Sequence, residues 1–424
     1  MSNPSVALRV TPGRPALVQS EDPQIGYFLI EASPAGIPDT GMDVPLNLCM
    51  VLDRSSSMRG ERLYQVKEAC NHIVGDLGRQ DYFSVVAFND RAEVVVPCQR
   101  PGDKEQIKRA IGMVEARGGT EMATGMQLGV QEIARPIMSR GVSRMILLTD
   151  GRTYGDESRC VDIARRAQAK GIGITALGVG DEWNEDLLET IAASENSRTE
   201  YITSAQQIFT VFADELKRLH NVVAQRVELR LHMRPGMEIR SLYRVRPFLS
   251  PLAPQQPSET LWKAPLGEWT GRDDQVFLLE VVLPPMPPGP QTLMRVELSY
   301  EIPSIDNKPF QSHLDIQLPV KPADQIKPDV DGVVKHWLER TVAYRLQSSA
   351  WEQVEQGNIE DATKKLRMAG TRLLEAGQTE LAQTVQDEAT RLLRSGSASD
   401  EGRKRIKYGT RGLVAAEREK LSGE

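Results

Sequence analysis

Short apolar runs alternate with longer amphipathic stretches between residues 44 and 222, and this alternation constrains the fold more than any other feature of the sequence. Three of the runs have the length and continuous apolar character of strands buried on both faces: LNLCMVLD (46–53), RMILLTD (144–150) and IGITALGVG (172–180). Apolar residues at helical spacing separate such runs, as over residues 60–77. Strands that alternate with helices predict a mostly parallel, doubly wound α/β sheet with helices on both faces. A hairpin between the apolar runs 82–88 and 92–98 predicts one antiparallel edge strand.

Two of the predicted strands end on an aspartate, Asp53 after MVL and Asp150 after ILLT. Ligands of doubly wound sheets bind at the carboxyl ends of the strands, so both carboxylates are expected at the binding edge. Either aspartate alone could cap a helix, but two of them at one edge favour a cation. Two hydroxyl groups, those of Ser55 and Ser57, follow Asp53 directly.

A further loop adds a third hydroxyl group to this edge. In ARGGTEMATGM (116–126), two glycines allow the backbone to bend closely before Thr120. The candidate metal ligands all offer oxygen atoms, and they are Asp53, Ser55, Ser57, Thr120 and Asp150. Two carboxylates and three hydroxyl groups suit a hard octahedral ion, which predicts Mg²⁺, with Mn²⁺ as the alternative. Because two aspartates only neutralise the dication, the ion is expected to attract one more carboxylate from a partner.

Three motifs in this order resemble the von Willebrand factor A (VWA) family and its metal-ion-dependent adhesion site (MIDAS): D-x-S-x-S at 53–57, G-G-T at 118–120 and LLTDG at 147–151. The resemblance covers under half of the chain and is to a bacterial-type intracellular multidomain form. It implies a Rossmann-like fold with neighbouring first and fourth strands. It also implies that Ser55, Ser57 and Thr120 contact the metal directly, whereas Asp53 and Asp150 act partly through water. The partner is then a protein that offers an Asp or Glu carboxylate to the metal.

Charged residues flank the predicted metal loops, and two interpretations of them stay open. Glu121 follows Thr120 at the rim, where it either points into solvent or lies near the ion. Arg54, Arg59 and Arg152 are either solvated loop charges or a basic collar that attracts an acidic partner.

The segments before and after the VWA-like region have a different pattern of apolar and turn-forming residues. Apolar runs separated by turn residues, as in GYFLIEA (26–32) and QVFLLEVVL (275–283), predict short strands before and after it. Two N-terminal strands cannot form a core alone, so they are expected to complete the later β-sandwich, with the α/β domain inserted between its strands. This layout is similar to that of the inner coat proteins of secretory vesicles.

Beyond the sandwich, the sequence predicts a helical bundle and then a mobile tail. Gly357 and Gly377 punctuate the helical stretches, and a polar segment rich in Ser and Gly follows them. The predicted domains are the N-terminal sandwich strands (1–40), the VWA domain with the MIDAS (41–223), the remainder of the β-sandwich (224–325), the helical bundle (326–395) and a flexible tail (396–424).

The tail contains a locally basic stretch, RKRIKYGTRGL (403–413), in an acidic protein. It is either a disordered tail or a docking segment. Ile406, Tyr408 and Thr410 alternate with other residues, a strand-like spacing that favours addition to a sheet edge of this chain or of a partner. Phosphorylation of Thr410 is the alternative, so a second partner is predicted around this residue.

Composition excludes several classes of protein. At 424 residues the chain is long enough for two or three domains, and its net charge of -6 argues against electrostatic binding of nucleic acid. The longest apolar runs are too short to span a bilayer, so no membrane association is expected. The four cysteines show neither metal spacing nor a disulfide framework, which predicts a reducing compartment and hence the cytoplasm.

Motifs of catalysis are missing from the sequence. It contains no nucleophile elbow and no phosphate-binding G-x-x-x-x-G-K-[ST] loop, and it places no general base beside the predicted metal. The chain is therefore predicted to be a metal-dependent protein-interaction module, a scaffold or adaptor, rather than an enzyme. A Mg²⁺-dependent hydrolase is one alternative. An accessory subunit of an AAA-type ATPase or chaperone, or of a kinase or phosphatase signalling system, is the other.

Overall fold

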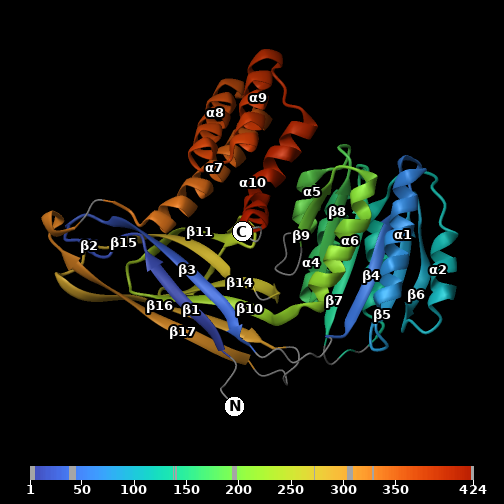
Figure 1. Cartoon of the computed structure of the whole chain (residues 1–424), viewed down its shortest axis with the longest axis horizontal. Helices are drawn as coiled ribbons and strands as arrows, with labels where there is room; N and C mark the ends of the chain where they lie inside the picture. The colour runs from blue at the N-terminus through green and yellow to red at the C-terminus, as the bar shows by residue number, and fades with distance from the viewer. Residues whose placement is uncertain are drawn as a thin grey trace.

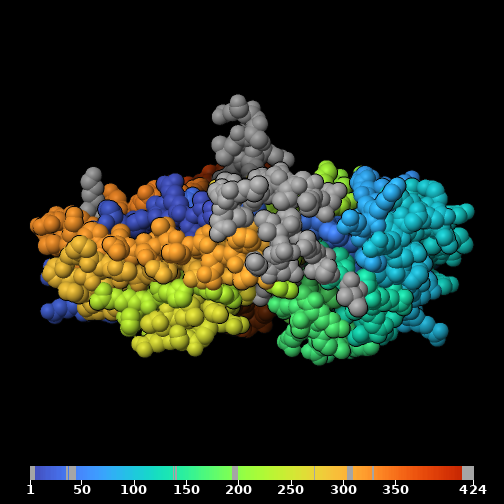
Figure 2. Space-filling view, turned by 90° about the horizontal axis from the view of Figure 1, so that it is seen from below, coloured from blue at the N-terminus to red at the C-terminus, as the bar shows by residue number. Residues whose placement is uncertain are grey.

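The computed structural model describes residues 5–37, 44–136, 138, 141–192, 198–271, 273–302, 309–326 and 329–421. Figure 1 shows three parts: a β-sandwich on the left, an α/β domain on the right, and a group of helices above them. Seen from below, the sandwich and the α/β domain lie side by side (Figure 2). In the described part of the chain, no helix is long and apolar enough to cross a membrane.

The α/β domain is built on a six-stranded sheet with the order β6-β5-β4-β7-β8-β9. Its strands are β4 (Leu46–Asp53), β5 (Tyr82–Phe88), β6 (Ala92–Gln99), β7 (Val142–Thr149), β8 (Ile172–Val179) and β9 (Arg198–Ile202). Neighbouring strands are parallel except β5 and β6, which are antiparallel at the edge. The sheet confirms the predicted doubly wound architecture, with its antiparallel edge strand and its neighbouring first and fourth strands.

Helices cover both faces of this sheet because its central strands are apolar on both sides. The elements are η1 (Ser56–Met58), α1 (Glu61–Asp76), α2 (Lys104–Gly112), α3 (Met122–Ile133), α4 (Glu157–Ala169), α5 (Glu185–Ile191) and α6 (Ala205–His220). On one face, Val66 of α1 and Phe212 of α6 pack in the same core as Met50 of β4. On the other face, Met126 of α3 packs in the same core as Val51 of β4.

The β-sandwich consists of two antiparallel-rich sheets, with the orders β1-β3-β15-β11-β12 and β13-β14-β10-β16-β17-β2. Its strands are β1 (Ser5–Pro12), β2 (Leu17–Val18), β3 (Gln24–Gly36), β10 (Val222–Met233), β11 (Glu238–Arg246), β12 (Ser250–Leu252), β13 (Gln255–Ser258), β14 (Leu261–Thr270), β15 (Gln275–Leu283), β16 (Gly289–Glu301) and β17 (Pro309–Lys321). The inner faces share one apolar core that includes Phe28, Leu229 and Phe277.

The N-terminal strands complete this sandwich, as predicted. β3 pairs with β15 over nine residues, and β1 then pairs with β3. β2 pairs with β17 in the other sheet. Since β3 comes before the α/β domain and β10 comes after it, the α/β domain is inserted between strands of one sandwich.

The C-terminal part of the chain is helical. Its helices are α7 (Gly332–Glu355), α8 (Ile359–Glu375), α9 (Thr379–Ser395) and α10 (Asp400–Leu421). Leu366 of α8 and Val385 of α9 pack in a shared core with part of α7. The other side of α7 lies on the sandwich, where Trp337 and Tyr344 pack with Leu278 of β15. An apolar contact therefore attaches the helical domain to the sandwich.

The prediction of a mobile tail with strand-like spacing is wrong for residues 400–421, which form helix α10. A spacing of four residues places Ile406 and Thr410 on one face of this helix, and both side chains are buried. Three alternating positions span only five residues, which is too short to separate a period of two from a period of 3.6. Gly402, Ile406 and Thr410, each four residues after the one before, are buried on one face of the helix, and Lys404 is buried on another.

Deletion of residues 1–35 is expected to destabilise the sandwich, because it removes β1 and most of β3 and leaves one edge of β15 unpaired. Phe28, Leu29 and Ile30 are buried, and burial of each such side chain contributes roughly 1.5–3 kcal/mol. Calorimetry should show a melting temperature lower by about 10 °C or more than that of the full chain, or no soluble protein. A control that lacks only residues 1–4 should melt like the full chain. An unchanged melting temperature in the longer deletion would contradict this account of the insertion.

Candidate metal centre

Adjacent parallel strands bring two aspartates to one edge of the α/β sheet. β4 pairs with β7 so that Leu52 is opposite Leu148, and Asp53 ends β4. Asp150 follows the last residue of β7. Both aspartates are buried, with Asp53 at 0% and Asp150 at 1% exposure. Two buried carboxylates at one edge require hydrogen-bond donors or positive charge.

Two hydrogen-bond donors hold the carboxylate of Asp53. Its Oδ1 accepts a bond from the backbone N–H of Ser55 at 2.7 Å, and its Oδ2 accepts one from the hydroxyl group of Thr149 at 2.7 Å. Burial raises the pKa of Asp53 to about 6, and the nearby charge of Asp150 adds to this rise, whereas the two hydrogen bonds lower it. A cation beside this carboxylate would favour the charged form.

Ser55 and Ser57 connect the two aspartates. Ser55 Oγ lies 3.0 Å from Ser57 Oγ, and Ser57 Oγ donates to Asp150 Oδ1 at 2.7 Å. Ser56, between them, turns away and donates its hydroxyl group to the carbonyl of Gly118 at 3.0 Å. Four of the five residues predicted as ligands therefore form one hydrogen-bonded cluster.

The second loop brings Thr120 to the same edge. Gly118 has a φ of 78°, and a Cβ at this position would collide with the carboxylate of Asp90, so the loop requires glycine here. The hydroxyl oxygen of Thr120 lies 3.6 Å from the position that a Cβ would occupy on Gly151. Since Gly151 follows Asp150, all five predicted ligands lie in the loops of one sheet edge.

The donor set of this edge suits a hard divalent cation. Carboxylate and hydroxyl oxygens are the ligands that Mg²⁺ and Mn²⁺ accept. Among the described residues, no group of three or more His, Cys, Asp or Glu side chains could hold a metal ion. A metal at this edge would therefore depend on its hydroxyl ligands as well as on the two aspartates.

Arg62 is a candidate functional residue that the sequence analysis missed. Its Nη1 lies 2.5 Å from Oδ2 of Asp150, and its side chain is 39% exposed. The available signal was its position in the first turn of α1, the helix that follows the first metal loop. Arg62 places a positive charge at the rim, where it balances part of the charge of Asp150.

The predicted basic collar is only partly assembled. Arg54 is buried and pairs with Glu93 at 2.5 Å, so its charge is already balanced. Arg152 has a half-exposed side chain and lies 3.7 Å from Asp400 of α10. Arg59 is exposed. Arg59 and Arg152 are therefore the solvent-accessible members of the expected set, and Arg62 is a further arginine at this edge.

The acids that follow the metal loops are engaged elsewhere. Glu121 pairs with Arg159 of α4 at 3.8 Å. Asp156 accepts a hydrogen bond from the backbone N–H of Ala123 at 2.7 Å, and its other carboxylate oxygen bonds the hydroxyl group of Thr153. The contacts of Asp156 connect the loop that follows β7, which is the third metal loop, to the start of α3.

Two family models match the chain. The von Willebrand factor type A domain matches residues 47–216, and the "Sll0103-like, C-terminal alpha-helical domain" matches residues 332–416. The uncharacterized protein sll0103 of Synechocystis sp. is 30% identical over 368 residues, which span 86% of this chain and 87% of that protein.

Two solved structures are similar over nearly the whole chain. A von Willebrand factor type A protein from Catenulispora acidiphila has a TM-score of 0.78 at 17% identity and covers 97% of this chain and 98% of its own. The ArnB paralog VWA2 from Sulfolobus acidocaldarius has a TM-score of 0.58 at 14% identity and covers 96% of this chain and 99% of its own. At these identities the likeness shows a shared fold.

Replacement of Gly118 by alanine should destabilise the second metal loop. The positive φ costs an alanine about 1–2 kcal/mol, and the added methyl group meets Asp90. Gly112→Ala is the matched control, because Gly112 ends α2 and a Cβ there has open space. Urea unfolding should show a loss of more than about 1 kcal/mol for Gly118→Ala and no loss for Gly112→Ala. Equal stability of the two variants would contradict the loop geometry.

Proposed function

The chain belongs to the Sll0103-like family of proteins with a von Willebrand factor type A domain, and from this premise we propose that its α/β domain is a metal-dependent protein-interaction module. The observation that supports this proposal most directly is the cluster of two buried aspartates joined by the hydroxyl groups of Ser55 and Ser57 at the sheet edge. Carboxylate and hydroxyl oxygens gathered at one edge are the ligands that a hard divalent cation prefers.

The metal is Mg²⁺, with Mn²⁺ as the alternative. Ser55, Ser57 and Thr120 contact it directly, and Asp53 and Asp150 act partly through water. When bound, the metal supplies a Lewis-acidic position that accepts an oxygen atom of a partner.

The partner is a protein segment that presents an Asp or Glu carboxylate. The two aspartates neutralise a dication, and Arg62 adds a positive charge at the rim, so the edge attracts an anion. Tyr154, in the third metal loop, is 82% exposed. Exposed tyrosines are effective interface residues, so the partner carboxylate is expected beside an apolar side chain.

A scaffold or adaptor role fits this edge better than hydrolysis. A hydrolase needs a general base that contacts the attacking water. Glu121 pairs with Arg159, and Asp156 bonds Ala123 and Thr153, so neither acid is free for that role.

A reducing compartment, the cytoplasm, suits the cysteines. Cys49, Cys70 and Cys160 are buried, Cys98 is partly buried, and all four are free. Burial raises the pKa of Cys49 and of Cys70 to about 12, which keeps these thiols protonated and unreactive.

Two adjacent serines give a matched test of the metal site. Ser57→Ala removes a proposed ligand, whereas Ser56→Ala removes a hydroxyl group that bonds Gly118 instead. Titration calorimetry with MgCl₂ should show an affinity about 10- to 100-fold lower for Ser57→Ala and a change below about threefold for Ser56→Ala. Asp53→Ala should abolish binding. Equal losses in the two serine variants would rule out this ligand assignment.

Partner capture tests the interaction role with the same variants. Immobilised full-length protein should retain a specific protein from a lysate of its source in Mg²⁺ but not in EDTA. Ser56→Ala should retain the same protein and Ser57→Ala should not. Release of phosphate from general phosphoester substrates in Mg²⁺, lost in Asp53→Ala, would favour the hydrolase instead.

A further inference from the structure

Helix α10 has one face in the helical domain and another on the α/β domain. Ile406 is fully buried in the apolar core of the helical domain. Tyr408 packs against an apolar core of the α/β domain. A step of two positions along an α-helix is a rotation of about 200° around its axis, so the side chains of Ile406 and Tyr408 point in nearly opposite directions. In Figure 1, α10 lies between the other C-terminal helices and α5.

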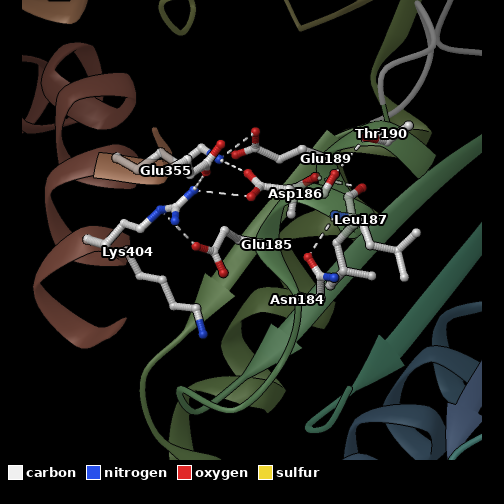
Figure 3. Close-up of polar contacts among 12 residues, drawn as sticks. Asn184, Glu185, Asp186, Leu187, Glu189, Thr190, Glu355 and Lys404 are labelled. Atoms are coloured by element: carbon white, nitrogen blue, oxygen red, sulfur yellow. Dashed lines mark hydrogen bonds and ion pairs between the residues drawn. The ribbon is translucent and has the colours of Figure 1, made fainter. Parts of the chain in front are cut away.

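Opposite charges line the two sides of this contact. α5 contributes Glu185, Asp186 and Glu189, and α10 contributes basic side chains one helical turn apart. The ion pairs are Arg403–Glu185 at 3.1 Å, Arg403–Asp186 at 3.1 Å, Lys407–Asp186 at 2.9 Å, Lys407–Glu189 at 2.9 Å and Arg411–Glu189 at 2.9 Å. Figure 3 shows Glu185 and Asp186 of α5 on one side of the contact and Glu355 and Lys404 on the other. Arg403 pairs with Glu355 of the helical domain as well as with the two acids of α5.

Lys404 is the most deeply buried cation of the contact. It is 0% exposed, and its Nζ donates to the backbone carbonyl groups of Asp181 and Trp183, at 3.1 Å in the second case. The same ammonium lies 4.6 Å from the centre of the Trp183 ring. Burial lowers the pKa of Lys404. The two carbonyl groups and the face of the Trp183 ring thus form a binding site for the ammonium group of one lysine on a helix.

Aromatic rings complete the receptor. Tyr408 lies 6.0 Å from Trp183 and 5.9 Å from Tyr201 of β9, measured between ring centres. The α/β domain therefore offers three kinds of contact over a short stretch: an acidic helix, a pair of carbonyl groups and an aromatic platform.

We propose that residues 181–189, with Tyr201, form a docking face for a basic helix, and that α10 occupies this face in cis as a releasable latch. α7 is attached to the sandwich by apolar side chains, whereas α10 meets α5 through ion pairs and meets Trp183 and Tyr201 through Lys404 and Tyr408. Asp186, which receives both Arg403 and Lys407, has a side chain that is 58% exposed. Ion pairs with exposed members weaken as salt rises, so the pairs made by Asp186 are the part of this contact that loosens more readily than the apolar attachment of α7.

The latch borders the metal edge. Asp400, at the start of α10, lies 3.7 Å from Arg152, two residues after Asp150. Gly180, which precedes Asp181, lies beside Arg62, since a Cβ there would be 3.1 Å from the guanidinium. If the proposed function holds, a partner at the metal edge meets the first turn of α10.

Thr410 lies on the face of α10 that also carries Ile406, which packs in the core of the helical domain. Thr410 is 1% exposed, and its hydroxyl group donates to the carbonyl of Ile406 at 2.7 Å. A second partner at Thr410 therefore requires α10 to leave the helical domain as well as the α/β domain.

Charge reversal on α10 tests the latch in the full chain, in EDTA, so that the result does not depend on the metal proposal. Lys407→Glu places a new carboxylate against Asp186 and Glu189. Arg405→Glu is the matched control, because Arg405 has a largely exposed side chain and its ion pair, with Glu401, lies within α10. Hydrogen exchange of the backbone amides in 400–412 should rise at least tenfold in Lys407→Glu and less than twofold in Arg405→Glu. The amides of the sandwich strands should not change.

A labelled peptide of residues 398–413 then tests the docking face itself. It should bind Lys407→Glu full-length protein at least tenfold more tightly than the wild type, whose face is occupied. The peptide with Lys407→Glu should bind neither protein. In the double variant Glu189→Lys, Lys407→Glu, opposite charges meet again, and exchange in 400–412 should move back toward the wild-type value.

Three results would overturn the proposal. The first is unchanged exchange of 400–412 in Lys407→Glu. The second is equal binding of the peptide to the wild type and the variant, or binding to neither. The third is a rise of exchange in the sandwich as large as that in α10, which would mean general unfolding.

Discussion

The antiparallel pairing of β3 with β15 is the contact on which the other parts of the molecule depend. It joins a strand that precedes the inserted α/β domain to one that follows it, over nine residue pairs. The sandwich thereby fixes both connections of the insert, since β3 leads into it and β10 leads out. The outer side of the same two strands carries Leu29 and Leu278, on which Trp337 of α7 packs. The sandwich thus also positions the helical domain.

Much of the metal edge could be predicted because its signals are local. Strands buried on both faces are recognisable in the sequence, and Asp53 and Asp150 stand at the ends of two of them. The parallel pairing of β4 with β7 then brings the two carboxylates to the same edge. Arg62 could not be assigned in this way, because its contact with Asp150 depends on where α1 starts and how it lies. The buried position of Arg54 likewise depends on Glu93 of the edge strand β6.

The C-terminal helix was mispredicted because its partners are remote. Lys404 contacts Asp181 and Trp183, more than 200 residues earlier in the chain. No local pattern links a basic stretch of the tail to the acidic α5. Helix α10 also has few apolar residues from which a helical spacing could be recognised. The sequence left a disordered tail and a docking segment open, and for the docking segment the spacing of Ile406, Tyr408 and Thr410 favoured a strand. Tertiary burial on two faces stabilises the helix instead.

Two joints hold the α/β domain against the rest of the chain, and they differ in burial. At the sandwich, Arg144 of β7 pairs with Glu268 of β14, with side chains only 2% and 6% exposed. Breaking a buried pair by removing one partner costs about 3–5 kcal/mol, because the other charge is left uncompensated. At α10, exposed pairs such as Lys407–Asp186 contribute roughly 0.2–1 kcal/mol each and are screened by salt. The sandwich joint is therefore the fixed one. In the proposed latch, the contact at α10, beside the metal edge, separates while the sandwich joint is kept.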